Sequence, residues 1–248
     1  MKQTRILMGM PVTLEVVDPS ATEQVFDTVF SYFEYVDEKF SAYKEGSEIS
    51  SINRREITLE ESSADMKTVF ALAELTKRQT HGYFDIARNG SYDPSGLVKG
   101  WAVYNAAEIL RQKGFENYYV DAGGDVQAAG KNSHGQNWRA GIRNPFNLNE
   151  IVKVLSVSNC GVATSGTYIR GQHIYNPKKN DQPITDIVSL TVIGPNVYEA
   201  DRFATAAFAM GRDGIFFIES LESLEGYMID QNRQATFTRG FERYVIRD

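Results

Sequence analysis

Apolar residues in the first half of the chain recur every three or four positions, the period of an amphipathic helix. They keep this spacing over residues 22–43, which predicts one long helix with an aromatic stripe. A second helix is predicted to start at Ser62 or Ser63 and to stop at Gly82, because glycine suits a helix end. A third is predicted between Gly100 and Gly114. The aromatic stripe is expected to pack in the core and not to bind a cofactor.

The second half of the chain changes to short β-rich segments separated by Gly, Asn and Pro turns. An earlier segment, residues 5–17, alternates around Pro11 and is predicted to be an edge strand or half of a hairpin, since proline has no N–H for a central ladder. Further strands are predicted at residues 118–120, 126–129, 138–142, 152–157, 161–164, 187–193, 226–229, 235–237 and 243–246, with helices at 198–210 and 214–221.

This order of elements lacks a regular strand–helix–strand alternation, so it predicts an α+β fold with a largely antiparallel sheet core and packed helices. The chain has no internal repeat, low-complexity tract or linker. Residues 1–248 are therefore expected to form one domain.

Composition narrows the class of protein. The 248 residues are 42% hydrophobic and 23% charged, which is ordinary for a globular protein with a substantial core. A net charge of −6 argues against a nucleic-acid partner. Cys160 is the only cysteine, which excludes an internal disulfide framework and fits a reducing compartment. No apolar run is long enough for a signal peptide or a membrane span, so a cytoplasmic location is expected, although a chain trimmed of a leader would look the same.

A carboxylate and a hydroxyl stand four positions apart in Ala200-Asp201-Arg202-Phe203-Ala204-Thr205. In a helix this spacing stacks Asp201 and Thr205 on one face, where their oxygens could hold Mg²⁺. The alternative is a helix start, with Asp201 favouring the dipole and Thr205 bonding back to the preceding turn. A metal reading needs a phosphate-bearing partner, because Mg²⁺ usually relies on substrate phosphates.

Other polar segments could each have either a functional or a structural role. The segment from Asp93 to Gly100 precedes a helix and suits a phosphate, although it lacks the P-loop glycine pattern. His173 follows a polar turn at residues 164–167 and is either a general base for a hydroxyl proton or a structural histidine. The glycines of Asp121-Ala122-Gly123-Gly124-Asp125 permit either close ligand approach or a tight hairpin. Tyr43 and the run Tyr83-Phe84-Asp85 put aromatic rings next to acids, as stacking faces or as core plugs.

In order and spacing, nine short segments resemble the ApbE family, the FAD:protein FMN transferases. The resemblance covers most of the chain. The segments are Met8-Gly9-Met10, Phe40-Ser41-Ala42-Tyr43, Ser47-Glu48-Ile49, Gly82-Tyr83-Phe84-Asp85, Asp93-Pro94-Ser95-Gly96-Leu97-Val98-Lys99-Gly100, Gly123-Gly124-Asp125, Thr164-Ser165-Gly166, His173-Ile174-Tyr175-Asn176-Pro177 and Ala200-Asp201-Arg202-Phe203-Ala204-Thr205.

The resemblance implies an enzyme with a T-fold-related architecture that binds FAD and Mg²⁺. It would move FMN to a Thr or Ser hydroxyl in the flavinylation motif of an acceptor flavoprotein, and it would release AMP. By position, the metal ligands are Asp201, Thr205 and the carbonyl of Gly96, with Asp201 also catalytic, and His173 is the base that deprotonates the acceptor. The residues implied to line the FAD site are Met8, Tyr43, Tyr83, Phe84, Asp85, Asp93, Lys99 and Ile174.

The chain also departs from the family pattern. Met10 stands where threonine is usual, Pro94 interrupts the usual Asp-Leu, Asn176 replaces an aspartate, and Ala204 stands where some members have another acid. The spacing from Asp85 to Asp93 is that of compact members, and no lipoprotein-type leader precedes the chain as given. Two alternatives remain open: a metal-dependent FAD pyrophosphatase giving FMN and AMP, and a non-catalytic FAD-binding or flavin-storage protein.

Overall fold

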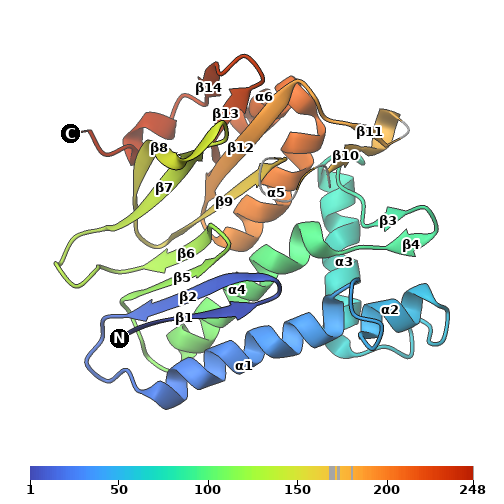
Figure 1. Cartoon of the computed structure of the whole chain (residues 1–248), viewed down its shortest axis with the longest axis horizontal. Coiled ribbons are helices and arrows are strands. Elements are labelled where there is room, and N and C mark those ends of the chain that lie inside the picture. The colour runs from blue at the N-terminus through green and yellow to red at the C-terminus, as the bar shows by residue number, and fades with distance from the viewer. Residues whose placement is uncertain (168–170, 172–173, 180, 248) are drawn as a thin grey trace.

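An antiparallel sheet of eight strands forms the centre of the molecule, in the order β1-β2-β5-β6-β9-β12-β13-β14 (Figure 1). The structure is a computed structural model that describes residues 1–167, 171, 174–179 and 181–247. Every neighbouring pair in this sheet is antiparallel, which confirms the predicted fold class. The strands are β1 Lys2–Leu7, β2 Met10–Val16, β5 Tyr118–Ala122, β6 Asp125–Ala129, β9 Cys160–Gly166, β12 Ile187–Gly194, β13 Glu225–Asp230 and β14 Ala235–Phe237.

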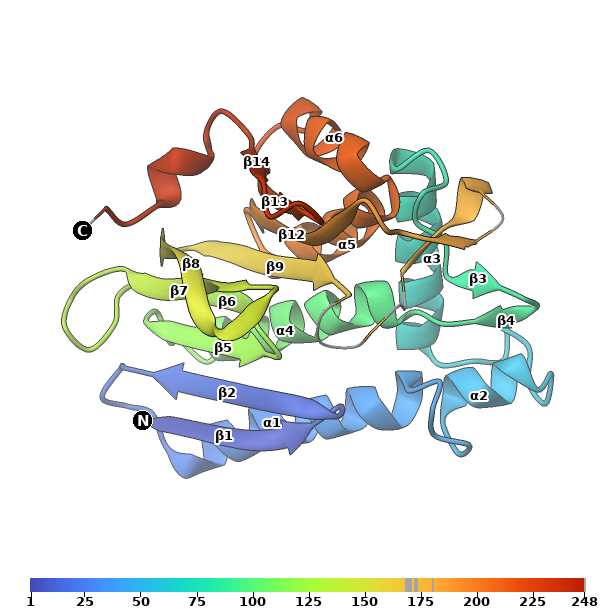
Figure 2. The ribbon, with the colours of Figure 1, turned by 45° about the horizontal axis from the view of Figure 1, so that its top comes forward.

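Helices cover one face of this sheet, and a hairpin covers the other (Figures 1 and 2). Alternation along the strands produces the two faces: Val192 of β12 packs towards the helices, whereas its neighbour Ile193 packs towards the hairpin. The helices are α1 Glu23–Phe40, α2 Glu48–Asn53, α3 Ala64–Gln79, α4 Ser95–Gln112, α5 Val197–Ala209 and α6 Gly214–Ser220, and the hairpin is β7 Trp138–Asn144 with β8 Asn147–Val157.

Short elements complete the described part of the chain. The hairpin β3–β4 lies beside α2 at one end of the molecule, and β10 pairs with β11 near α3 (Figure 1). Their bounds are β3 Ala87–Arg88, β4 Ser91–Tyr92, β10 Tyr175–Asn176 and β11 Gln182–Pro183, with 3-10 turns η1 Pro177–Lys179, η2 Gly211–Asp213 and η3 Phe241–Tyr244. No helix in these described stretches combines the length and apolar character that crossing a bilayer requires.

The third predicted helix begins earlier than expected. It was predicted to follow Gly100, but α4 starts at Ser95, whose N–H donates to Asp93 Oδ1 at 3.0 Å. Gly100 therefore lies inside the helix. A Cβ there would lie 2.5 Å from the Cβ of Asp201, so this glycine permits a close crossing of two helices instead of stopping one. Helix α2 was missed, because its six residues are too few for a periodic pattern.

One strand prediction is confirmed in one of its two alternatives, and another is wrong. Residues 10–16 form β2, which is half of the β1–β2 hairpin, but β2 is not an edge strand because it lies between β1 and β5. The missing N–H of Pro11 is tolerated because Pro11 is only the second residue of the strand. Residues 243–246 form no strand: η3 ends there, followed by a single bridge between Val245 and Leu155. Phe241 explains this ending, since its buried ring stacks on Tyr227 with centroids 5.1 Å apart and draws the chain over the sheet.

Candidate active site

The three side-chain and backbone oxygens expected to bind a metal meet where α4 crosses α5. Thr205 Oγ1 donates a hydrogen bond of 3.2 Å to the carbonyl oxygen of Gly96. One turn along α4, the Gly100 N–H donates to Asp201 Oδ2 at 2.7 Å. A Cβ at Gly96 would lie 3.0 Å from Thr205 Cγ2, so α4 needs a glycine at this position for the close approach to α5. The sequence pattern thus brings Gly96, Asp201 and Thr205 together from segments about a hundred residues apart.

The charge at this crossing is unusual for a protein interior. Asp201 is only 2% exposed, and Asp125, also buried, stands close to it. Lys99 Nζ lies 2.6 Å from Asp125 Oδ2 and 3.7 Å from Asp201 Oδ1. Burial raises the pKa of Asp201 to about 7, and the Asp125 carboxylate adds to the rise, whereas Lys99 and the Gly100 N–H oppose it. With both acids ionised, these three side chains carry a formal charge of −1, which a bound cation would offset.

The donor chemistry suits a hard cation. A carboxylate, a hydroxyl and a backbone carbonyl are all oxygen ligands of the kind that Mg²⁺ takes. Within the described ranges, no three acidic, histidine or cysteine side chains gather as a metal cluster. The set at the α4–α5 crossing is instead mixed, with one acid, one hydroxyl and one carbonyl. The residues present therefore fit a Mg²⁺ ion that keeps several waters or substrate oxygens.

Strand β9 supplies a polar edge next to this crossing. Ser165 Oγ lies 3.4 Å from Thr205 Oγ1, and the Thr164 N–H donates to Asp125 Oδ1 at 3.1 Å. The chain then continues from Gly166 towards His173, the expected general base. His173 lies outside the described residues, so its role stays a prediction.

Asp125 is a member of this cluster to which sequence reasoning gave no role. It is the first residue of β6 and follows Gly123 and Gly124, whose φ angles of +62° and +99° make the tight turn after β5. The sequence signal was present, because Gly-Gly-Asp belongs to the segments that resemble the ApbE family. What the sequence did not reveal is that this turn aims the acid at Lys99.

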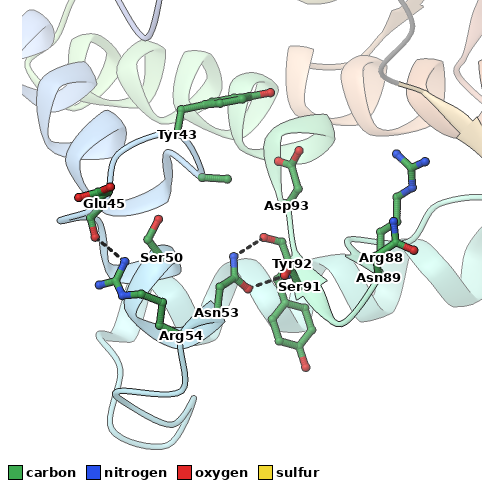
Figure 3. A pocket seen from close by; sticks show the side chains of 11 residues that line it. Tyr43, Glu45, Ser50, Asn53, Arg54, Arg88, Asn89, Ser91, Tyr92 and Asp93 are labelled. Carbon is green, nitrogen blue, oxygen red and sulfur yellow. Dashed lines mark hydrogen bonds between the residues drawn. The ribbon is translucent and has the colours of Figure 1, made fainter.

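Two of the residues implied to bind FAD share one pocket. Tyr43 and Asp93 line a cavity of about 460 Å³ between α2 and the β3–β4 hairpin, together with Asn53 and Arg88 (Figure 3). The Tyr43 side chain is 89% exposed, so its ring face is open to a ligand. Asn53 fixes the pocket wall by hydrogen bonds to both the N–H and the carbonyl of Tyr92. Figure 3 shows the Tyr43 ring and the Asp93 carboxylate on the same side of this pocket.

The other residues implied to bind FAD have different surroundings. Phe84 is 3% exposed and packs beside Gly96, and Ile174 is 7% exposed, so either could offer only an apolar wall. Asp85 pairs with Lys77 at 2.7 Å and lines a second cavity, of about 490 Å³. The ring of Tyr83 lies under Lys178 Nζ, 4.7 Å away. Met8 occupies the β1–β2 turn with φ +52°, and Lys99 belongs to the α4–α5 crossing. Their roles towards FAD stay predictions.

Comparisons with known proteins show the family of this chain. The sequence model of the ApbE family matches residues 8–91 and 87–228. A FAD:protein FMN transferase of Haemophilus influenzae is 32% identical over 147 residues, which cover 55% of this chain and 42% of the relative. One of Escherichia coli K12 is 30% identical over 146 residues, with the same shares. The match therefore spans about two fifths of the length of these curated relatives.

Solved structures give the same fold over nearly the whole chain. The flavin transferase ApbE of Vibrio cholerae superposes with a TM-score of 0.85 at 23% identity and covers 98% of each chain. The ApbE protein of Thermotoga maritima superposes with a TM-score of 0.89 at 19% identity, over 100% of this chain and 99% of that one. At this level of identity the likeness establishes the fold, and the match to the family over most of the sequence establishes the relationship. The chain belongs to the ApbE family.

Proposed function

We propose that this chain is a Mg²⁺-dependent FAD:protein FMN transferase, which moves FMN from FAD to a Thr or Ser hydroxyl of an acceptor flavoprotein and releases AMP. The observation that carries the proposal is the meeting of Gly96, Asp201 and Thr205 at the α4–α5 crossing, with Lys99 beside them. Family membership and the names of the curated relatives support the same activity.

The proposed reaction is a phosphoryl transfer. The acceptor oxygen attacks the phosphorus of the FMN half of FAD, the bond from that phosphorus to the bridging oxygen breaks, and AMP leaves with the bridging oxygen. Such a transfer needs aligned reactants and neutralised phosphate charge, with little covalent help from the protein. Mg²⁺ held by Asp201, Thr205 and the Gly96 carbonyl would supply positive charge to the pyrophosphate oxygens.

Other residues of the chain would bind and orient the reactants. The exposed face of Tyr43 would stack on a flat ring of FAD, and the nearby Asp93 carboxylate would accept from ring or ribose donors. Lys99 would add a second positive charge near the phosphates. His173 would take the proton of the acceptor hydroxyl, which as general-base catalysis contributes a factor of about 10² to 10⁴.

The test is incubation of the whole protein with FAD, Mg²⁺ and an acceptor protein that carries an Asp-Gly-x-Ser/Thr-x-Ala-Thr stretch. Intact-mass spectrometry should find an FMN adduct on the acceptor, with an equal amount of AMP in solution, and EDTA should prevent both. FMN and AMP without an adduct would identify a pyrophosphatase that uses water as acceptor. FAD that binds without turnover would identify a flavin-storage protein.

A further inference from the structure

Lys99 lies between two buried carboxylates but is not shared equally between them. Its ammonium is 2.6 Å from Asp125 Oδ2 and 3.7 Å from Asp201 Oδ1. We propose that Asp125 is a positioning residue that holds the Lys99 ammonium off Asp201, so that the Asp201 carboxylate stays available to a divalent cation. This inference rests on the proposed metal-dependent function and gives Asp125 a role within it.

Both carboxylates are fixed by backbone groups, whereas the lysine is adjustable. Asp125 Oδ1 accepts from the Thr164 N–H on the neighbouring strand at 3.1 Å, and its backbone begins β6 directly after the Gly123-Gly124 turn. Asp201 Oδ2 accepts from the Gly100 N–H at 2.7 Å. The Lys99 ammonium is at the end of a flexible four-carbon side chain, so its position is set by the nearest fixed negative charge. Asp125 therefore sets the position of the Lys99 ammonium.

Removal of the Asp125 charge should redirect the ammonium. Asp201 Oδ1 lies 3.7 Å from the Lys99 ammonium, so charge attraction in this largely buried site should draw the ammonium towards Asp201 once the Asp125 charge is gone. A direct Lys99–Asp201 pair would neutralise the proposed metal ligand and bring the summed charge of the remaining pair to zero. Cation binding would then weaken although Asp125 itself touches no cation.

The deciding experiment measures Mg²⁺ binding by titration calorimetry on the whole protein without FAD. Asp125→Asn keeps an oxygen for the Thr164 N–H but loses the charge. We expect it to weaken Mg²⁺ binding by about 10- to 100-fold, the usual effect of residues that orient a metal ligand. Lys99→Met should bind Mg²⁺ at least as tightly as the wild type, because the competing ammonium is gone. The double variant should return to within about threefold of the wild type, as expected for two coupled neighbours.

Asp121→Asn is the matched control. Asp121 lies in β5 immediately before the same turn, accepts from the Gly124 N–H at 2.8 Å, and acts on Lys99 through charge. Asparagine can keep that hydrogen bond, so the variant removes a nearby negative charge without freeing Lys99. Its Mg²⁺ affinity should fall by less than about threefold.

Several outcomes would overturn the inference. A double variant as weak as Asp125→Asn would make Asp125 a ligand of the metal itself. A Lys99→Met protein that binds Mg²⁺ more weakly than the wild type would show that the ammonium does not compete, and this test holds even if Asp125→Asn does not fold. Failure of the proposed function looks different: the wild type would then bind no Mg²⁺ or would transfer no FMN. If the wild type transfers FMN and Asp125→Asn binds Mg²⁺ as tightly as the wild type does, only the positioning role of Asp125 is refuted.

Discussion

Arg202 Nη1 donates a hydrogen bond of 2.6 Å to Gln79 Oε1, which ties the helix carrying Asp201 to the last turn of α3. The guanidinium is almost fully buried, donates also to Thr76 Oγ1 and to Glu199, and lies 4.0 Å above the ring of Phe203. Helix α3 leads directly into the segment that holds Tyr83, Phe84 and Asp85. Arg202 therefore links the proposed metal site to part of the proposed FAD site.

Arg202→Met should destabilise the protein by about 2 kcal/mol, because it removes the charged donor of the buried Thr76 hydroxyl and of the half-buried Glu199 carboxylate. Urea unfolding followed by circular dichroism would measure the change. Arg111→Met is the matched control, since Arg111 is exposed and pairs across one turn with Glu108, a contact worth about 0 to 1 kcal/mol. Equal losses of unfolding free energy in the two variants would contradict a stabilising role of Arg202 between α3 and α5.

The sequence predicted the long elements well, because their patterns are local. The helix at residues 22–43 and the helix capped by Ser63 follow from apolar spacing and capping chemistry, and both are present within a few residues. Asp201 and Thr205 were identified for the same reason, since four positions in one helix define a shared face. Their third partner, Gly96, came only from the family resemblance, because no local pattern indicates a carbonyl on another helix.

What the sequence missed depends on contacts between distant segments. Gly100 looked like a helix boundary, but its N–H donates to the Asp201 carboxylate across the α4–α5 crossing. Asp125 looked like part of a hairpin turn, and its pairing with Lys99 emerges only when β6 and α4 are folded together. Pro11 favoured an edge strand or half of a hairpin, and only the position of β1 shows that β2 is the inner strand of a hairpin. These positions depend on tertiary contacts, which produce no periodic pattern in the sequence.

Gly100→Ala should be destabilising although alanine is the better helix former by about 1 kcal/mol. The new Cβ would meet Asp201 Cβ at 2.5 Å and the Val197 carbonyl oxygen at 2.9 Å, so the two helices would have to separate. Overpacking of this kind costs about 1 to 3 kcal/mol, and it should also weaken Mg²⁺ binding. Gly46→Ala is the control, since nothing lies within 4 Å of its Cβ position. Thermal unfolding and calorimetry measure both effects, and a more stable Gly100→Ala protein would refute the close crossing.

Glu48 should make stability depend on pH. Burial alone would raise its pKa, but hydrogen bonds from the N–H and hydroxyl of Ser63 and from Lys39 outweigh this and hold the pKa below its ordinary value of 4.5. A lowered pKa in the folded state stabilises the protein above pH 4.5, and that contribution is lost as the pH falls through the folded-state value. Glu48→Gln should therefore be less stable than the wild type at pH 7, and the gap should close towards pH 3.

Urea unfolding at several pH values between 7 and 3 measures this gap. Glu60→Gln, an exposed acid before the same helix, is the control and should follow the wild type at each pH. If the loss in Glu48→Gln is the same at pH 3 and pH 7, the hydrogen bonds from Ser63 and Lys39 do not stabilise the ionised carboxylate.

Thr205 allows a test of the proposed metal site that spares its shape. Thr205→Val keeps both branches at Cβ, including the methyl group packed beside Gly96, but removes the hydroxyl that faces the Gly96 carbonyl. If this hydroxyl is a ligand, calorimetry should find Mg²⁺ binding weakened by at least about tenfold, with FMN transfer reduced at low Mg²⁺ and partly recovered at high Mg²⁺. Thr205→Ser keeps the oxygen and should bind Mg²⁺ nearly as the wild type does, despite losing the methyl contact. If serine were as damaging as valine, packing against Gly96 and not ligation would be the function of Thr205.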